Sequence, residues 1–186
     1  FQWQIDYGEL NNIDSIVTLL FTKDYTQSNW SAWGKLYKRE IIIANVLNFD
    51  ENNYGSEDLA FNLRILPYLN TVFSCSDNIV NYRTNNTASI TKNVKPKTIL
   101  SLLEALNDAN ELMCKCKLDK TTQILVFNNL SMWYLYCIKR YNLLDRKSKA
   151  KFKEYKRLNC MFKYSSIAKL KICRLIISLF GIRLSN

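Results

Sequence analysis

The chain has 186 residues, enough for one domain of ordinary size or for a small domain with a helical appendage. Hydrophobic residues make up 48% and charged residues 23%, a balance that excludes a disordered chain. The formal charge of +10 is unevenly divided: residues 1–92 carry seven Lys/Arg against ten Asp/Glu, whereas residues 93–186 carry nineteen against six. The basic character therefore belongs to the second half. With only four Gly and two Pro, the composition favours long helices.

The sequence contains no histidine, which excludes imidazole-liganded zinc sites and Ser–His or Cys–His catalytic pairs. The cysteines are irregularly spaced, and their one close pair has C-x-C rather than C-x-x-C spacing. Most of them fall in apolar helical stretches, so we expect small buried hydrophobic side chains rather than metal or redox groups. Reduced thiols fit a cytoplasmic compartment. The six residues are Cys75, Cys114, Cys116, Cys137, Cys160 and Cys173.

In the first half, short strands and short helices are predicted to alternate. Apolar residues at every second position predict a strand over 1–7, and a helical spacing of apolar residues predicts a helix over 13–21. Ser56 is a suitable N-cap for a helix with two acids in its first turn, and Pro67 should end that helix. Two β-type runs, which predict a hairpin or a pair of adjacent strands, follow at 71–75 and 78–83.

After Pro96 the pattern becomes helical and basic. Three helices and a fourth, amphipathic segment are predicted at 98–115, 120–144, 146–162 and 165–184. The change of character near 93–96 is the best internal boundary. We therefore expect an α/β unit of mixed α+β type at 1–93, followed by a helical, basic C-terminal extension at 94–186.

Three short motifs occur in order in the first half. W-G-K-L-Y-K-R occupies 33–39, E-D-L occupies 57–59, and Y-R at 82–83 is followed by S-I-T at 89–91. This set resembles the C-terminal part of the GT-A catalytic domain of bacterial family 2 glycosyltransferases, with W-x-K-L-Y-[KR]-[RK], E-D-L, Y-x-Y-R and S-I-T. The match covers 30–92, about a third of the chain. The resemblance implies that the first unit is the acceptor-side part of a GT-A domain.

The resemblance implies that Asp58, the aspartate of E-D, is the catalytic base of an inverting sugar transfer. Such a transfer needs a carboxylate that removes the proton of an acceptor hydroxyl while the hydroxyl attacks the anomeric carbon of a nucleotide-sugar. In the surrounding cleft, an indole offers a flat apolar face for a sugar ring, and an ammonium can meet a diphosphate oxygen. The residues expected to bind substrate in this way are Trp33, Lys35, Glu57, Tyr82 and Arg83.

Each of these residues also has a plainer interpretation. Two acids at the start of a helix stabilise its dipole without any catalytic role. Trp33 and Lys35 fit a core tryptophan beside a solvated basic cluster, and a tyrosine–arginine pair at a strand end is commonly structural. Trp30, at the edge of the first motif, fits packing better than binding.

The nucleotide-binding half expected of such an enzyme is missing from this sequence. That half carries a D-x-D pair, which holds a divalent metal against the sugar-nucleotide diphosphate, and here neither that pair nor a Gly-rich phosphate loop occurs in the right place. We therefore expect the chain to come from a longer protein and to be inactive alone. The resemblance implies a nucleotide-sugar donor, a glycan or lipid-linked acceptor, and a Mg²⁺ or Mn²⁺ cofactor whose ligands lie outside this chain.

The basic second half has three interpretations. Fourteen Lys/Arg and two acids lie within 139–183, and the segment 165–184 combines this charge with an apolar face. The pattern fits a helix on an anionic membrane surface, a solvated or intramolecular helix, or a nucleic-acid site, and the apolar face argues against the last. Because the apolar run 175–180 is too short to span a bilayer, we expect peripheral attachment through 146–184 on the cytoplasmic face of the membrane, with no nucleic acid.

Two other functional interpretations remain open from the sequence. One is a non-catalytic helical module that docks on a membrane or a partner protein, in which case the E-D-L match arises by chance. The other is a degenerate remnant of a glycosyltransferase, which rests only on the missing nucleotide-binding half.

Overall fold

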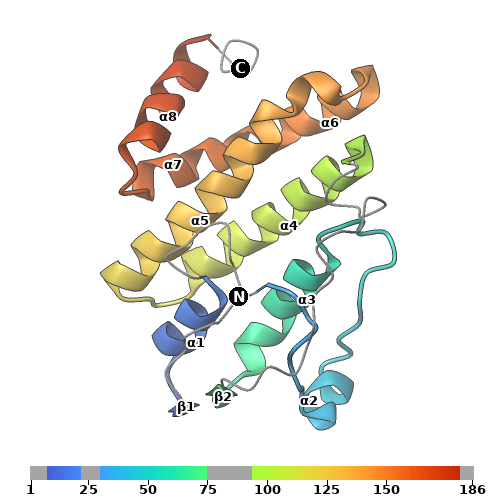
Figure 1. The fold of residues 1–186 in the computed structure, drawn as a ribbon, viewed down its shortest axis with the longest axis vertical. Helices are drawn as coiled ribbons and strands as arrows, with labels where there is room; N and C mark the ends of the chain where they lie inside the picture. Colours follow the sequence, from blue (N-terminus) through green and yellow to red (C-terminus); the bar gives the residue numbers. More distant parts are fainter. Residues whose placement is uncertain (1–7, 22–29, 75–93, 181–186) are drawn as a thin grey trace.

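The computed structural model describes residues 8–21, 30–74 and 94–180 (Figure 1). About 70% of these residues are helical, and the sheet among them has two strands. The predicted α/β fold class, a GT-A remnant of mixed type, is therefore wrong: the described chain is mainly helical. The physical reason is that its strands are too short and too few to build a sheet that covers a core, whereas the long apolar helices do so.

Among the described residues, three α-helices precede the predicted boundary. The first confirms the helix expected at 13–21, and its N-cap residue Asn12 accepts a hydrogen bond from the Ser15 N–H through Oδ1 at 2.8 Å. The third ends where Pro67 was expected to end it and continues as a single 3₁₀ turn, because proline lacks the N–H that an α-helix needs. The helices are α1 (Ile13–Leu20), α2 (Arg39–Ala44) and α3 (Glu57–Ile65).

The two strands come from distant parts of the first half. β1 (Gly8–Leu10) pairs antiparallel with β2 (Val72–Ser74), with Glu9 opposite Phe73. The strand expected at 71–75 is thus confirmed, and its described partner is β1. The predicted strand at 1–7 and the second run of the predicted hairpin, at 78–83, lie outside the described residues.

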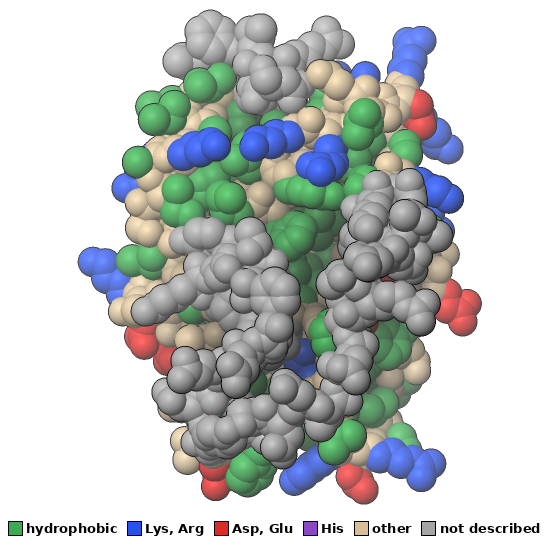
Figure 2. Space-filling view, viewed as in Figure 1, with side chains coloured by type: hydrophobic (Ala, Val, Ile, Leu, Met, Phe, Trp, Pro, Cys, Tyr) green, Lys and Arg blue, Asp and Glu red, His purple; other side chains and the backbone are tan. Residues whose placement is uncertain are grey.

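The second half is helical, as the sequence predicted, but two of the predicted helices are shorter: α-helix ends at Lys139 in the one predicted over 120–144, and a 3₁₀ segment at Tyr155–Cys160 divides the one predicted over 146–162. Three of the helices start at recognisable sites: Pro96 is the first residue of its helix, and Asp119 and Asp145 accept N-cap hydrogen bonds through their carboxylates at 2.7 and 2.8 Å. Among the described helices, none combines the length and the apolar character needed to cross a membrane. Figure 2 shows Lys and Arg side chains interspersed with hydrophobic ones where α5 and α8 lie. The helices are α4 (Pro96–Lys115), α5 (Lys120–Lys139), α6 (Arg146–Glu154), α7 (Met161–Tyr164) and α8 (Ala168–Phe180).

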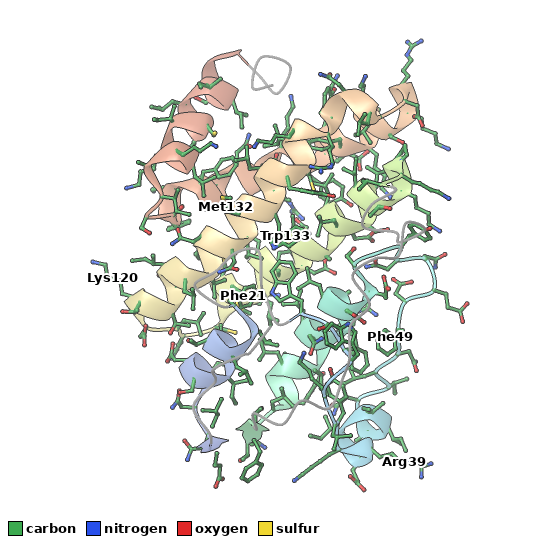
Figure 3. All side chains as sticks on the ribbon, in the orientation of Figure 1. Phe21, Arg39, Phe49, Lys120, Met132 and Trp133 are labelled. Carbon is green, nitrogen blue, oxygen red and sulfur yellow. The ribbon has the colours of Figure 1, made fainter. Side chains whose placement is uncertain are left out.

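One hydrophobic cluster joins both halves of the chain. It runs from α1 and α3 through α4, α5 and α7 to α8. Trp30 is buried in it, with its ring centroid 5.7 Å from Phe21 and 5.3 Å from Trp133, which confirms that Trp30 serves packing (Figure 3). The division at 93/94 remains a prediction, and the core crosses it.

The cysteines are less buried than expected. Cys137 is buried, whereas Cys114 and Cys160 are exposed, and the thiols of the described cysteines are free. Cys114 lies near the end of α4, off its apolar stripe, so it does not reach the core. Cys75 lies outside the described residues.

Candidate functional site

The N-terminus of α3 holds the predicted base, Asp58, after a tight turn. Gly55 precedes the helix with φ of 84°, a conformation that glycine adopts without strain, and its N–H donates to Glu57 Oε2 at 2.8 Å. The Ser56 hydroxyl and N–H both donate to Asn53 Oδ1, at 2.9 and 3.3 Å. Ser56 therefore occupies the predicted N-cap position, but its side chain does not cap the helix because Asn53 engages it. Asp58 lies in the first turn, partly exposed.

The loop before α3 is fixed to the rest of the fold on two sides. The Tyr54 N–H donates to Ser101 Oγ on α4 at 3.0 Å. Phe49 stacks on Phe61 of α3, with ring centroids 4.4 Å apart and planes 11° from parallel (Figure 3). The start of α3 is therefore a rigid support for a functional carboxylate, which is what a site with fixed geometry requires.

Lys35 approaches Asp58 from the segment that carries the first motif. Its ammonium donates to the carbonyl oxygen of Ser31 and is partly buried. Burial lowers the pKa of Lys35 from 10.5 to about 8, and the charge of Asp58 acts in the opposite direction. The ammonium of Lys35 is thus within electrostatic range of Asp58, and its role in binding substrate remains a prediction.

A hydrogen-bond network behind Asp58 joins the same two segments. The Tyr37 hydroxyl donates to Asn62 Oδ1 at 3.1 Å, and Asn62 Nδ2 donates to the carbonyl oxygens of Trp30 and Asp58, both at 2.8 Å. Burial raises the pKa of Tyr37 to about 12; the bond to Asn62 opposes this rise and the charge of Asp58 adds to it. The phenol is thus neutral near pH 7 and remains a hydrogen-bond donor.

Tyr37 and Asn62 were not among the site residues predicted from the sequence. Tyr37 belongs to the same motif as Trp33 and Lys35. Asn62 lies four residues after Asp58, so these two residues share a helix face. These positions could have marked both residues as candidates from the sequence alone. The contact between Tyr37 and Asn62, which are 25 residues apart, could not be predicted from such local spacing.

Trp33 lies on the surface beside this cluster and not in the core. Its side chain is 49% exposed, and that of Leu36, in the same motif, is fully exposed. The interpretation of Trp33 as a core tryptophan is therefore wrong, because Trp30 takes that role. An indole is a side chain that can stack on the ring of a sugar ligand.

The remaining predicted substrate-binding residues are Glu57, Tyr82 and Arg83. The Glu57 carboxylate accepts the Gly55 N–H, so it closes the turn that leads into α3. Its contact with substrate remains a prediction. Tyr82 and Arg83 lie outside the described residues.

The acids of the described residues do not form a metal site: no three His, Cys, Asp or Glu side chains gather there. Asp50 accepts the Asn52 N–H at 2.9 Å, a bond that lowers the pKa of Asp50, and pairs with Arg64 at 3.5 Å. The expected Mg²⁺ or Mn²⁺ ion therefore remains a prediction about the nucleotide-binding half.

The described residues bring together a carboxylate, an ammonium and a phenol from two separate segments. The carboxylate of Asp58 can accept a proton, while the ammonium of Lys35 and the indole of Trp33 can bind an anionic group and an apolar ring face. In comparisons with protein-family models, with curated proteins and with solved structures, no match to the chain was found.

Proposed function

We propose that this chain is the acceptor-side half of an inverting glycosyltransferase resembling family 2, with Asp58 as its general base. The observation that carries the proposal is the hydrogen bond from Tyr37, in the first motif, to Asn62 on α3, which in turn bonds the backbone carbonyl of Asp58. Lys35, in the same motif as Tyr37, is within electrostatic range of Asp58. The segments that carry the first two motifs thus contact each other at α3.

The proposed reaction is a single displacement. An acceptor hydroxyl of a glycan or a lipid-linked sugar attacks the anomeric carbon of the nucleotide-sugar, and the new C–O bond forms on the face opposite the leaving group. The bond from the anomeric carbon to the diphosphate oxygen breaks, and the nucleoside diphosphate leaves with the electron pair. Asp58 takes the hydroxyl proton during the attack, a contribution of about 10²–10⁴-fold to the rate.

Lys35 and Trp33 would bind substrate on either side of the base. The lowered pKa of Lys35, about 8, leaves it mainly protonated at pH 7, so it can pair with a diphosphate oxygen. The exposed indole of Trp33 can stack on an acceptor sugar ring. Glu57, Tyr82 and Arg83 complete the proposed set.

The exposed apolar side chains of the first half support the proposal that another part of a larger protein covers them. The sequence of α2 contains three isoleucines, yet none of its residues is buried. Large hydrophobic side chains that are about half exposed or more recur in the first half of the chain: Trp33, Leu36, Ile43, Val46, Phe49 and Phe73. Apolar surface of this extent fits contact with another part of a larger protein. In the proposal this part is the nucleotide-binding half, which supplies the donor site and the Mg²⁺ or Mn²⁺ ligands.

The test of this proposal compares the chain alone with the chain joined to its nucleotide-binding half. Each sample receives a panel of nucleotide-sugars, and release of nucleoside diphosphate is measured with and without glycan acceptors. The proposal predicts release only from the completed enzyme. Sugar transfer by these 186 residues alone would contradict it.

We also propose that helices within 146–184 hold the protein on the cytoplasmic face of the membrane as a peripheral protein. α6 exposes the basic residues Arg146, Lys147, Lys151 and Lys153. A shallow hollow beside it is lined by Tyr141 together with basic side chains of α6. Anionic lipid headgroups are the complementary surface, at about 1 kcal/mol for each basic residue close to it.

A second candidate function is a non-catalytic module that docks on a membrane. The observation that favours it is that α8 exposes apolar side chains that no described residue covers. Thermal unfolding of the completed protein distinguishes the two candidates. Stabilisation by nucleotide-sugar or saccharide supports the transferase, and vesicle binding without any ligand response supports the module.

A further inference from the structure

The helix α8 has two apolar faces, and the fold uses one of them. Leu170 is fully buried, Ile177 is 6% exposed, and Cys173 packs against the same cluster. These positions follow the i, i+3, i+7 spacing of one helix face. Through them α8 packs on α7 and α5 (Figure 1).

The opposite face of α8 is also apolar, and it points outward. Ile172 is 57% exposed and Leu175 is 61% exposed, and Ala168 is exposed one turn before them. Their i, i+4, i+7 spacing forms a second stripe on the helix, roughly opposite the buried one. A helix that is merely solvated would place polar residues here.

Basic residues lie on both sides of the outward stripe. Lys169 borders one flank and Lys171 the other, and Arg174 lies beyond Lys171, closer to the buried face; all three are exposed. No Asp or Glu occurs anywhere in 155–186. The ion pairs among the described residues join other side chains, so these three cations remain available for an anionic surface.

We propose that the outward stripe of α8, formed by Ala168, Ile172 and Leu175, inserts into the headgroup region of an anionic membrane while the flanking Lys169, Lys171 and Arg174 bind lipid phosphates. This inference rests on the proposed membrane attachment and names the face that makes it. An apolar stripe between basic flanks is the pattern of a helix that lies in the plane of a bilayer surface. The 13 described residues of α8 are fewer than the roughly 20 that span a bilayer, and the inner face of α8 packs on the rest of the protein.

The long side chains of Lys and Arg allow the stripe and the cations to bind the membrane at different depths. Lys and Arg extend their apolar stems along the surface and carry their charges outward, so they reach headgroup phosphates while the stripe lies deeper. Charge alone would hold the protein above the surface. The combination predicts binding that has a salt-sensitive part from the cations and a salt-resistant part from Ile172 and Leu175.

The experiment is co-sedimentation of the whole chain with vesicles of phosphatidylcholine, with and without phosphatidylglycerol. The double variant Ile172→Gln/Leu175→Gln keeps helix propensity and removes the stripe. The matched control Leu36→Gln/Ile43→Gln replaces two exposed aliphatic residues far from α8 in the sequence. We expect about 10- to 30-fold weaker partitioning of the stripe variant, from the apolar area removed, and unchanged partitioning of the control. Circular dichroism checks that both variants remain folded.

Three results would overturn the inference. If the stripe variant pellets like the wild type while high salt releases both, attachment is purely electrostatic, and the membrane proposal stands without α8. If the wild type does not pellet with anionic vesicles at all, both proposals fail. If the wild type fails to pellet but dimerises in solution, and the stripe variant is a monomer, the stripe binds a second copy of the chain instead.

Discussion

The network around Asn62 gives the sharpest test of the site's architecture. Asn62 is 3% exposed and joins the first motif to α3 through hydrogen bonds with Trp30, Tyr37 and Asp58. The substitution Asn62→Ala leaves the Trp30 carbonyl without this partner inside the core. It also removes the acceptor of the Tyr37 hydroxyl, which is only partly buried and can regain water in its place.

The expected cost follows from these contacts. An orphaned buried polar group costs about 1–3 kcal/mol, and the small cavity left by the side chain adds to it. Because water partly compensates for the loss at Tyr37, the total should be about 2–4 kcal/mol in the free energy of unfolding. Asn48→Ala is the control: Asn48 is exposed and makes one long bond, 3.5 Å to the Val46 carbonyl, so its loss should cost less than about 0.5 kcal/mol.

Urea denaturation at neutral pH, followed by far-ultraviolet circular dichroism, measures both variants. Adding Tyr37→Phe completes a double-mutant cycle, which should give a coupling of about 0.5–1.5 kcal/mol between Tyr37 and Asn62. A loss below about 1 kcal/mol for Asn62→Ala, or a loss no larger than that of Asn48→Ala, would refute the role of this network.

Three further predictions concern titration, helix docking and capping. Because burial lowers the pKa of Lys35 to about 8, the unfolded chain binds more protons than the folded chain between pH 8 and 10.5, so stability rises there with pH. Denaturation at about pH 7.5 and about pH 9.5 should show that Lys35→Met abolishes about 1–2 kcal/mol of this rise, after allowance for solvent screening. Asn128→Ala removes bonds that tie α5 to Ser165 at 2.6 Å and Ser166 at 2.9 Å; it should cost about 2–4 kcal/mol in urea and expose α8 to faster proteolysis. Asp145→Ala removes the N-cap of α6 and should lower the urea concentration at the unfolding midpoint, measured by the same titration.

Local patterns predicted most of the helices, although α2 (Arg39–Ala44) was not predicted and α4 begins two residues before its predicted start at 98. Pro96 at the start of α4 and the N-cap Asp145 before α6 act through contacts with their immediate neighbours. Such contacts involve residues that are close in the sequence, so the sequence alone can predict them. The end of α3 at Pro67 was predictable for the same reason.

Contacts between segments that are distant in the sequence could not be predicted. β2 pairs with β1, some sixty residues earlier in the chain, and this pairing leaves no trace in either run alone. The fold class was wrong because the strand-type runs gave no measure of how much core the helices would supply. The candidate site combines both kinds of information: the motifs indicated Asp58 and Lys35, whose roles remain predictions, whereas Asn62 emerged only through its contacts with the segment that carries Trp30.

The most direct test of the account is the rate of sugar transfer in a single turnover by the completed enzyme carrying Asp58→Asn. The amide keeps the size of the side chain and cannot take the acceptor proton, so the rate should fall about 10²–10⁴-fold while nucleotide-sugar affinity stays nearly unchanged. Asp50→Asn is the control, because that carboxylate serves a turn and pairs with Arg64. Transfer by Asp58→Asn at the wild-type rate would contradict the central claim that Asp58 is the base.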